Sequence, residues 1–233
     1  MSFEFHTTHW SIILRAKGDD TAAKAALAML CETYYQPILK SLDRIVVADH
    51  ARVYGGRDAT DLTHDFIARI LEGKMFTRIQ RDGAPFRVYL LGTLRLFLSQ
   101  LRIRESAQKR GGDMRPATFP DDSPEPNGFD DAVFDRDWAL SMIQRAMLLL
   151  EPSQEDSRDV PVRHLLPWVT QEMNAETRGR LAAKLGLSDT AIKVSLHRLR
   201  KKFRHTIRTL IAETVKDASE IDAELDHLIL ALR

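Results

Sequence analysis

Hydrophobic residues recur every three or four positions over most of the 233-residue chain, which is the spacing of one face of an α-helix. Runs that alternate apolar and polar residues, typical of half-buried strands, are scarce. The pattern therefore predicts an all-α fold. Helical segments separated by Gly-rich or Pro-containing breaks fill residues 10–110, and a second helical block runs from residue 132 to about residue 215.

Residues 111–131 differ from both helical blocks. They hold four prolines and three glycines, are rich in Asp and Glu, and offer few side chains to bury. This composition is typical of a flexible linker. We therefore expect two small helical domains, at residues 1–110 and 132–215, joined by an acidic flexible linker at residues 111–131 and followed by a C-terminal helix at residues 216–233.

The C-terminal segment predicts an amphipathic helix. Its apolar face consists of Ile221, Leu225, Leu228, Ile229 and Leu232. Its acidic residues, which we expect elsewhere on the helix, are Glu220, Asp222, Glu224 and Asp226. We expect this helix to dock on its own protein rather than on a partner, because an apolar face of this width needs a covering surface.

The stretch LGLSDTAIKVSLHRLRKKFR, residues 185–204, combines an apolar stripe with a group of cations. Ser188 is a good N-cap, and the helix dipole favours Asp189 in the first turn. At 100° per residue, four apolar side chains fall within about 60° of one another and form a buried stripe: Ile192, Leu196, Leu199 and Phe203. A short helix that ends at a Gly-containing turn precedes this one, so the order is that of a helix-turn-helix.

The opposite side of the same helix suits duplex DNA. In a helix-turn-helix, N-terminal residues of the second helix reach base edges in the major groove, while later cations meet phosphates. The base-side candidates are Thr190, Lys193, Val194 and His197. The phosphate-side candidates are Arg198, Arg200, Lys201 and Arg204. A solvated basic face on an ordinary helical bundle is the alternative interpretation.

The formal net charge of +1 conceals a strong segregation of charge. Residues 176–210 carry ten Lys or Arg and two acids, whereas residues 116–137 carry seven acids and one Arg. Local charge therefore decides which partners the chain attracts. We hypothesise that the acidic segment competes with phosphate for the basic helix in the free protein.

The segment DATDLTHDFIARILEG, residues 58–73, predicts a second interface. Leu62, Phe66 and Ile70 share one helical face with Ala59, and an acidic stripe lies beside it. An acidic stripe next to an apolar one indicates docking on a basic protein partner. The docking candidates are Asp58, Asp61, Leu62, Asp65 and Phe66.

The segment PFRVYLLGTLRLFLSQLRIRESAQKRGG, residues 85–112, interleaves aromatic residues with cations. Aromatic side chains and cations together suit unstacked, single-stranded nucleic acid. The candidates on this segment are Arg87, Tyr89, Arg95, Phe97, Arg102, Arg104, Lys109 and Arg110.

These three segments, in this order and spacing, resemble the extracytoplasmic-function (ECF) sigma factors of bacterial RNA polymerase, over residues 10–215. The resemblance implies an alternative sigma factor that binds core RNA polymerase and promoter DNA. It implies that residues 58–73 dock on the polymerase, residues 86–110 capture and melt the −10 element, and the helix after Ser188 reads the −35 element. A free-standing helix-turn-helix regulator that binds duplex operator DNA is the alternative.

The match has departures. Family members commonly have an acidic residue where Thr60 stands, Gln at His64 and Phe at Ile67, and more Asn or Asp is expected at Leu96 and Gln100. The docking face is therefore one charge weaker than is typical. A Ser/Thr kinase partner that phosphorylates Thr60 or Thr63 would restore negative charge there, and an anti-sigma factor is a further candidate partner.

Other chemistry is not predicted. HExxH, EF-hand, GxxxxGK(S/T) and GxSxG motifs are absent from the sequence, so we expect no enzyme, no metal and no cofactor. The single cysteine, Cys31, excludes an intramolecular disulfide and is expected to be buried; Trp10, Trp138 and Trp168 are expected in the core. A signal-peptide pattern and an apolar run of roughly 20 residues are both missing. We therefore expect a cytoplasmic protein that is monomeric when free.

Overall fold

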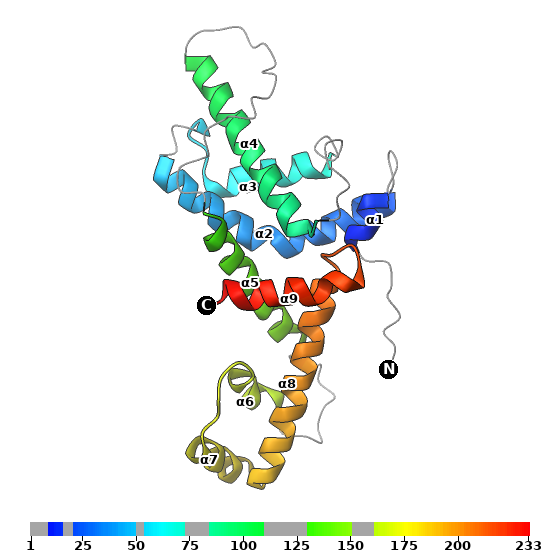
Figure 1. Ribbon diagram of the computed structural model, residues 1–233. Coiled ribbons are helices and arrows are strands. Elements are labelled where there is room, and N and C mark those ends of the chain that lie inside the picture. The colour runs from blue at the N-terminus through cyan, green and yellow to red at the C-terminus, as the bar shows by residue number, and fades with distance from the viewer. Residues whose placement is uncertain (1–8, 16–20, 50–53, 73–83, 110–129, 151–160) are drawn as a thin grey trace. The chain divides into compact units, whose positions relative to one another are not determined.

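The computed structural model describes residues 9–15, 21–49, 54–72, 84–109, 130–150 and 161–233 (Figure 1). These residues form helices and no strand, which confirms the all-α prediction. The elements are α1 (His9–Arg15), α2 (Thr21–Asp49), α3 (Ala59–Leu71), α4 (Phe86–Lys109), α5 (Asp131–Leu150), α6 (Val162–Leu165), η3 (Leu166–Trp168), α7 (Ala175–Leu185), α8 (Asp189–Ala212), η4 (Ala218–Glu220) and α9 (Ile221–Ala231).

The chain forms two compact units. Unit 1 consists of Met1–Ser141 and Ala212–Arg233, and unit 2 consists of Met142–Ile211. The chain therefore passes from one unit to the other inside α5 and again at the end of α8. The four-part division expected from the sequence stays a prediction, because the units are cut at different residues and most of the acidic segment lies outside the described ranges.

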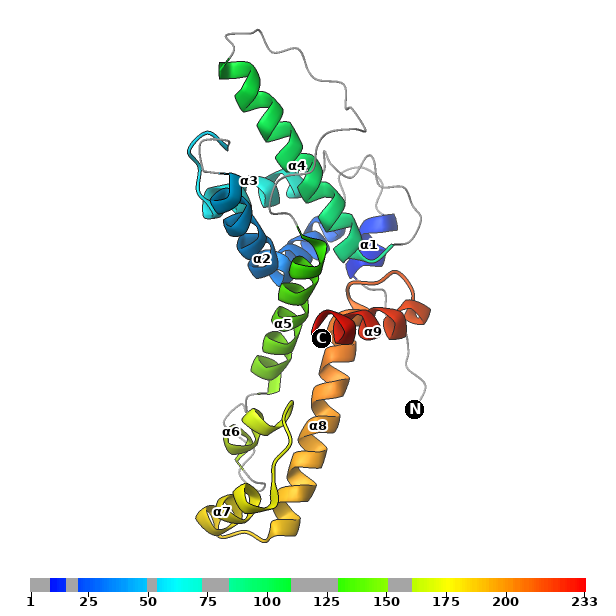
Figure 2. The same cartoon turned by 60° about the vertical axis from the view of Figure 1, so that its left-hand side comes forward.

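Unit 1 is built around α2, α3 and α4, with α1 beside the N-terminal end of α4 (Figures 1 and 2). Asp58 caps α3, since its side chain accepts a hydrogen bond of 2.8 Å from the Asp61 amide. The core is aromatic where the helices cross: the ring centroids of Trp10 and Phe86 lie 5.1 Å apart. Those of Phe66 and Phe97 lie 5.3 Å apart. Large side chains from α1 to α4 therefore fill one interior.

The expected core residues are largely confirmed. Trp10 and Trp138 are 1% exposed, whereas Trp168 is half-buried at the edge of the unit 2 core. Cys31 is buried, and burial raises the pKa of its thiol to about 12. The thiol is therefore neutral at physiological pH and acts as a small apolar side chain.

Unit 2 contains the predicted helix-turn-helix. Asn174 caps α7, and Gly186 ends it with a φ of 67°. The Leu187 amide donates to the Ala182 carbonyl at 3.0 Å, so the turn is a Schellman motif, which glycine adopts without strain. The Ser188 hydroxyl accepts from the Ala191 amide at 3.1 Å, which confirms Ser188 as the N-cap of α8.

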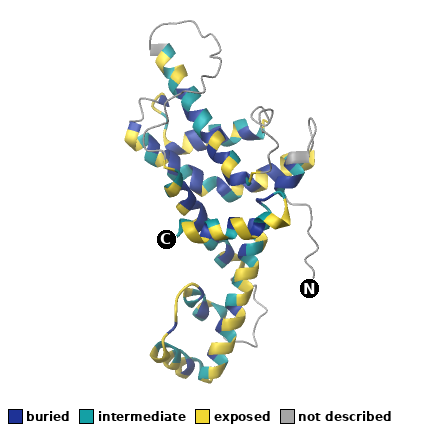
Figure 3. Cartoon of the chain, in the orientation of Figure 1, coloured by how far each residue is buried: buried dark blue, intermediate teal, exposed yellow. Residues whose placement is uncertain are grey.

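The apolar stripe of α8 forms the core of unit 2. Ile192, Leu196 and Leu199 are buried, and Phe203 packs partly buried against the same cluster. The stripe packs with residues from α5, α6, α7 and the η3 region: Leu150, Leu165, Val169, Met173 and Ala182. The opposite side of α8 is largely exposed (Figure 3).

The C-terminal helix α9 belongs to unit 1. Ile221 and Leu228 of the predicted apolar face are buried, whereas Ile229 is 46% exposed. Glu224 differs from its expected position on the polar side, because it is only 4% exposed. A buried carboxylate needs a partner of opposite charge, and the arginine that supplies one lies on α4.

Candidate nucleic-acid interface

The helix α3 carries the predicted docking residues, and the structure separates them into two groups. Leu62 and Phe66 are fully buried, so they hold α3 on unit 1 and offer no surface to a partner. Asp58 and Asp61 are exposed. Asp65 is half-buried between two arginines.

The pairing of Asp65 reduces the negative charge of this face. Arg57 Nη1 lies 3.1 Å from Asp65 Oδ2, and Arg69 Nε lies 3.2 Å from Asp65 Oδ1. The exposed surface around Asp61 also contains Thr60 and His64, whose Nε2 lies 3.1 Å from the Tyr35 hydroxyl. The acidic stripe expected from the sequence is therefore narrower in the folded chain, with Asp58 and Asp61 as its centre.

The aromatic residues of α4 face the core. Phe86 and Phe97 are fully buried. Tyr89 is half-buried, and its ring lies 5.4 Å from that of Trp10. The sequence interpretation of Phe97 as a stacking surface for bases differs from this placement, because positions 86, 90, 94, 97 and 101 lie on the face of the helix that packs inward.

Three of the predicted DNA-binding cations on α4 are paired with acids of the same unit. Arg95 Nη2 lies 2.6 Å from Asp131 Oδ1. Arg102 Nη2 lies 3.6 Å from Asp49 Oδ1. Arg87, the most buried of the three, pairs with two carboxylates and is described next.

Arg87 is the centre of a buried ion cluster. Its Nη1 donates to Asp135 Oδ1 at 2.8 Å and its Nε to Glu224 Oε1 at 3.1 Å. His227 Nε2 lies 2.8 Å from the other oxygen of Asp135, and the guanidinium lies 5.3 Å from the Trp138 ring. Burial lowers the pKa of Arg87, but the hydrogen bonds and charge of Glu224 and the charge of Asp135 outweigh it and raise that pKa above its usual value.

The remaining α4 candidates are more accessible or undescribed. Arg104 is exposed near the C-terminal end of the helix. The Lys109 side chain and Arg110 lie outside the described residues. In the described part of α4, the accessible cations are Arg104 and the partly exposed Arg95 and Arg102.

The helix α8 presents most of its candidates to solvent. The exposed residues are Thr190, Lys193, Val194, His197, Arg198, Lys201 and Arg204. They follow one another along successive turns of a single helix. The arrangement matches a surface that reads a groove with its first turns and contacts phosphates with its later turns.

Arg200 has a different position from the other phosphate-side candidates. Its guanidinium donates to the Trp168 carbonyl at 3.0 Å and to the Gln171 carbonyl at 2.6 Å. These carbonyls follow α6 in unit 2, so Arg200 joins that segment to α8. Its Nε and Nη2 groups therefore donate to backbone carbonyls inside the unit.

Asp189 organises the start of α8. Its carboxylate accepts from Arg178 Nε at 2.5 Å and lies 2.9 Å from Lys193 Nζ. The hydrogen bonds from Lys193 and Arg178 lower the pKa of Asp189. The carboxylate therefore connects α7 to α8 and pairs with the ammonium group of Lys193, a predicted base-side residue.

Sequence reasoning missed the side chains that form the ion cluster around Arg87. Asp135, Glu224 and His227 lie far from Arg87 in the chain, and each is compatible with an exposed helix surface when its own segment is considered alone. The one available signal was Arg87 itself, a cation within about 40° of Leu91 and Leu98 on the apolar face of α4. A cation at that position requires buried acids.

Other site types have little support in the described part of the chain. No group of three or more His, Cys, Asp or Glu residues there could hold a metal ion. Among those same residues, no helix is both long and apolar enough to span a membrane.

Comparison with known proteins identifies a family. A family model described as ECF sigma factor matches residues 8–209. No curated protein and no solved structure matches the chain significantly. The matched range includes α3, α4 and most of α8, and it ends before η4 and α9.

Proposed function

The chain belongs to the ECF sigma factor family, and from that premise we propose that it binds core RNA polymerase and directs it to promoters as an alternative sigma factor. The observation that supports this best is the exposed basic side of α8. It lies in the second helix of a helix-turn-helix whose turn and N-cap are both well formed. The function requires binding and positioning, with no catalytic group or cofactor.

We assign reading of the −35 element to α8. Thr190, Lys193, Val194 and His197 occupy the first three turns and reach base edges in the major groove. Arg198, Lys201 and Arg204 contact phosphates. Arg200 supports α8 from within unit 2, because its guanidinium already binds two backbone carbonyls.

We assign the −10 element to α4. Arg95, Arg102 and Arg104 are its accessible cations, and Lys109 and Arg110 extend the same basic end. Arg87, Tyr89 and Phe97 support the helix from beneath. Melting of the −10 element by this helix therefore depends on cations toward its C-terminal half.

We assign polymerase docking to the exposed part of α3. Asp58 and Asp61 face solvent at the start of the helix, with Leu62 and Phe66 anchoring it below. The phosphorylation hypothesis is confined to Thr60, which is exposed. Thr63 is buried and its hydroxyl donates to the Ala59 carbonyl at 2.7 Å, so a kinase has no access to it in the folded chain.

Capture of bacterial core RNA polymerase by the purified full-length protein tests the proposal. We expect stoichiometric capture by the wild type, loss of capture with Asp61→Arg, and retention with the matched reversal Asp226→Arg on the exposed side of α9. If the wild type captures no polymerase but binds duplex DNA alone, the protein is a free-standing regulator and the sigma assignment is wrong.

A further inference from the structure

Residues 213 and 214, which lie beyond the family match that ends at residue 209, cap two helices of unit 1. The Trp10 amide donates to the Glu213 carbonyl at 3.2 Å, and the Phe86 amide donates to the Thr214 carbonyl at 2.9 Å. The Glu213 carboxylate also accepts from the His9 amide at 3.0 Å. Amides in the first turn of a helix lack intrahelical acceptors, so this short segment supplies acceptors for the first turns of α1 and α4.

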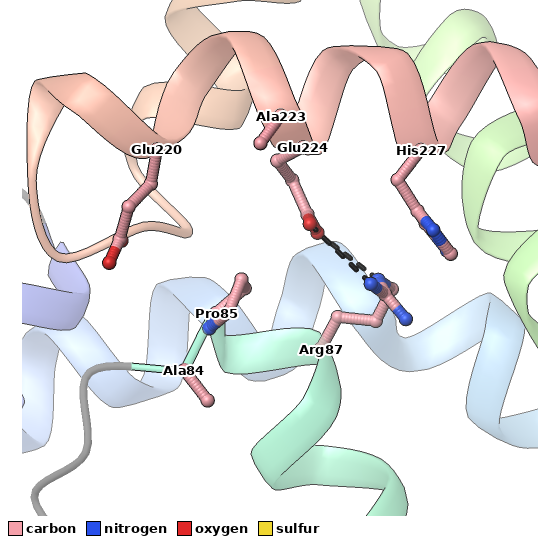
Figure 4. A pocket seen from close by; sticks show the side chains of 7 residues that line it. All are labelled: Ala84, Pro85, Arg87, Glu220, Ala223, Glu224 and His227. Carbon is pink, nitrogen blue, oxygen red and sulfur yellow. Dashed lines mark hydrogen bonds and ion pairs between the residues drawn. The ribbon is translucent and has the colours of Figure 1, made fainter.

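The helix α9 then joins α4 to the first half of α5. Glu224 accepts from Arg87 through both oxygens, at 3.1 Å and 3.4 Å, and Figure 4 shows the two side chains pointing at each other. Asp135 of α5 binds the same guanidinium from another side and also pairs with His227 of α9. The side chains of Arg87, Asp135 and Glu224 are 9%, 13% and 4% exposed.

Apolar contacts accompany the ion cluster. Val215, Ile221 and Leu228 are 0%, 7% and 4% exposed, so the segment buries side chains at its beginning, middle and end. A shallow cleft of about 460 Å³ lies beside the cluster, lined by Ala84, Pro85, Arg87, Glu220, Ala223, Glu224 and His227 (Figure 4). Arg87 of α4 and Glu224 of α9 both line this cleft and bind each other. The cleft therefore marks the contact between α4 and the C-terminal segment.

We infer that residues 213–228 form an intramolecular strap, a partner in cis that holds α1, the start of α4 and the first half of α5 together. Glu213 and Glu224 are positioning residues, since they act through α1 and α4 and touch no nucleic acid. The strap thereby fixes the orientation of α4 for the −10 element. The role of the strap in promoter melting rests on the proposed function, whereas its docking on unit 1 does not.

Hydrogen exchange of the full-length protein tests the docking. We expect Glu224→Gln to raise the exchange rate of amides in α1 and at the start of α4 by about tenfold or more, because Arg87 loses a charged partner. Exchange in α7 and α8 should stay unchanged. The charge-matched control is Asp226→Asn, an exposed acid on the same helix, which should leave both regions at wild-type rates.

A shortened chain that ends at Ala212 gives a second test. A synthetic peptide of residues 213–233 added in trans should restore protection of α1 and α4, and the same peptide with Glu224→Ala should not. Wild-type protection in both Glu224→Gln and the shortened chain would overturn the inference. Equal restoration by both peptides would overturn the role of Glu224.

Promoter melting separates this inference from the proposed function. With core polymerase, Glu224→Gln should bind polymerase as the wild type does but open the −10 region less, as measured by permanganate reactivity of its thymines. Faster opening would mean that the strap blocks α4 instead of positioning it. If the wild type captures no polymerase, the proposed function fails, while the exchange results still decide whether the strap exists.

Discussion

The helices α4 and α8 have similar sequence patterns and different surroundings. Each has 24 residues, an apolar stripe and several arginines. On α4, Arg87, Arg95 and Arg102 all pair with carboxylates of unit 1. On α8, Lys201 and Arg204 are exposed, and neither forms an ion pair with any other described residue.

The difference follows from the acids within reach of each helix. Residues 176–210 contain ten Lys or Arg and only two acids, so the sequence around α8 supplies few carboxylates for its cations. Acids from α2, α5 and α9 surround α4. Arginines of α4 therefore stabilise the fold through ion pairs, whereas Lys201 and Arg204 of α8 are exposed cations that the proposed function assigns to DNA phosphates.

Among these cations, replacement of Arg87 should have the largest effect on the stability of the protein. Arg87→Met leaves the buried Glu224 carboxylate without its cationic partner and Asp135 with His227 alone, so we expect the free energy of unfolding of unit 1 to fall by about 3–5 kcal/mol. Urea unfolding followed by Trp10 and Trp138 in a Trp168→Phe background measures it. The control, Arg104→Met at an exposed site, should change the value by less than about 0.5 kcal/mol. Equal effects of the two variants would contradict the buried cluster.

Arg200 tests whether α8, like α4, contains an arginine that stabilises the fold. Arg200→Ala removes hydrogen bonds to the Trp168 and Gln171 carbonyls, so we expect unit 2 to lose about 2–3 kcal/mol of stability. Lys201→Ala should leave stability unchanged and instead reduce the salt dependence of promoter binding by about one phosphate contact. Thermal unfolding and a salt titration of the polymerase complex measure the two effects. A normal Tm for Arg200→Ala with a reduced salt slope would return Arg200 to the phosphate class.

Lys193 sharpens the distinction between base and phosphate contacts on α8. We expect Lys193→Ala to weaken binding at the cognate −35 element by about 1 kcal/mol, because this exposed lysine lies in the second turn of α8 and its ammonium is positioned by Asp189. Competition between cognate and unrelated promoter fragments for the polymerase complex measures the loss. An equal loss on unrelated DNA would show that Lys193 contacts phosphate.

Much of the fold follows from local sequence features. Ser188, Gly186 and the stripe of Ile192, Leu196 and Leu199 define the helix-turn-helix because caps, turns and helical spacing act over a few residues. The helix α3 follows in the same way from its N-cap Asp58 and its apolar face. Periodicity also placed Leu62 and Phe66 on that apolar face, but it could not decide whether the face meets the core or a partner.

The parts that local patterns missed are long-range pairings. The contact between Arg87 and Glu224 joins residues 137 positions apart, and neither segment predicts it alone. The same reason explains why Arg95 and Arg102 looked available for DNA and why Glu224 looked exposed. The sequence gives the charge of each side chain, but tertiary packing decides whether an opposite charge lies close enough to pair with it.

Breaking the pair between Arg95 and Asp131 should have the smallest effect on stability. This pair tests whether a partly exposed arginine of α4 belongs to the fold or can also contact DNA. Both side chains are partly exposed, at 36% and 47%, so Asp131→Asn should cost less than about 1 kcal/mol of stability. If phosphate can replace Asp131, the free protein should bind single-stranded −10 DNA about two- to threefold more tightly. The control is Asp137→Asn, which loosens α5 from Lys40 and Arg44 of α2 without releasing a cation of α4. Tighter binding with the first variant alone would place Arg95 with the cations that we assign to DNA; unchanged binding would place it with Arg87, as part of the fold.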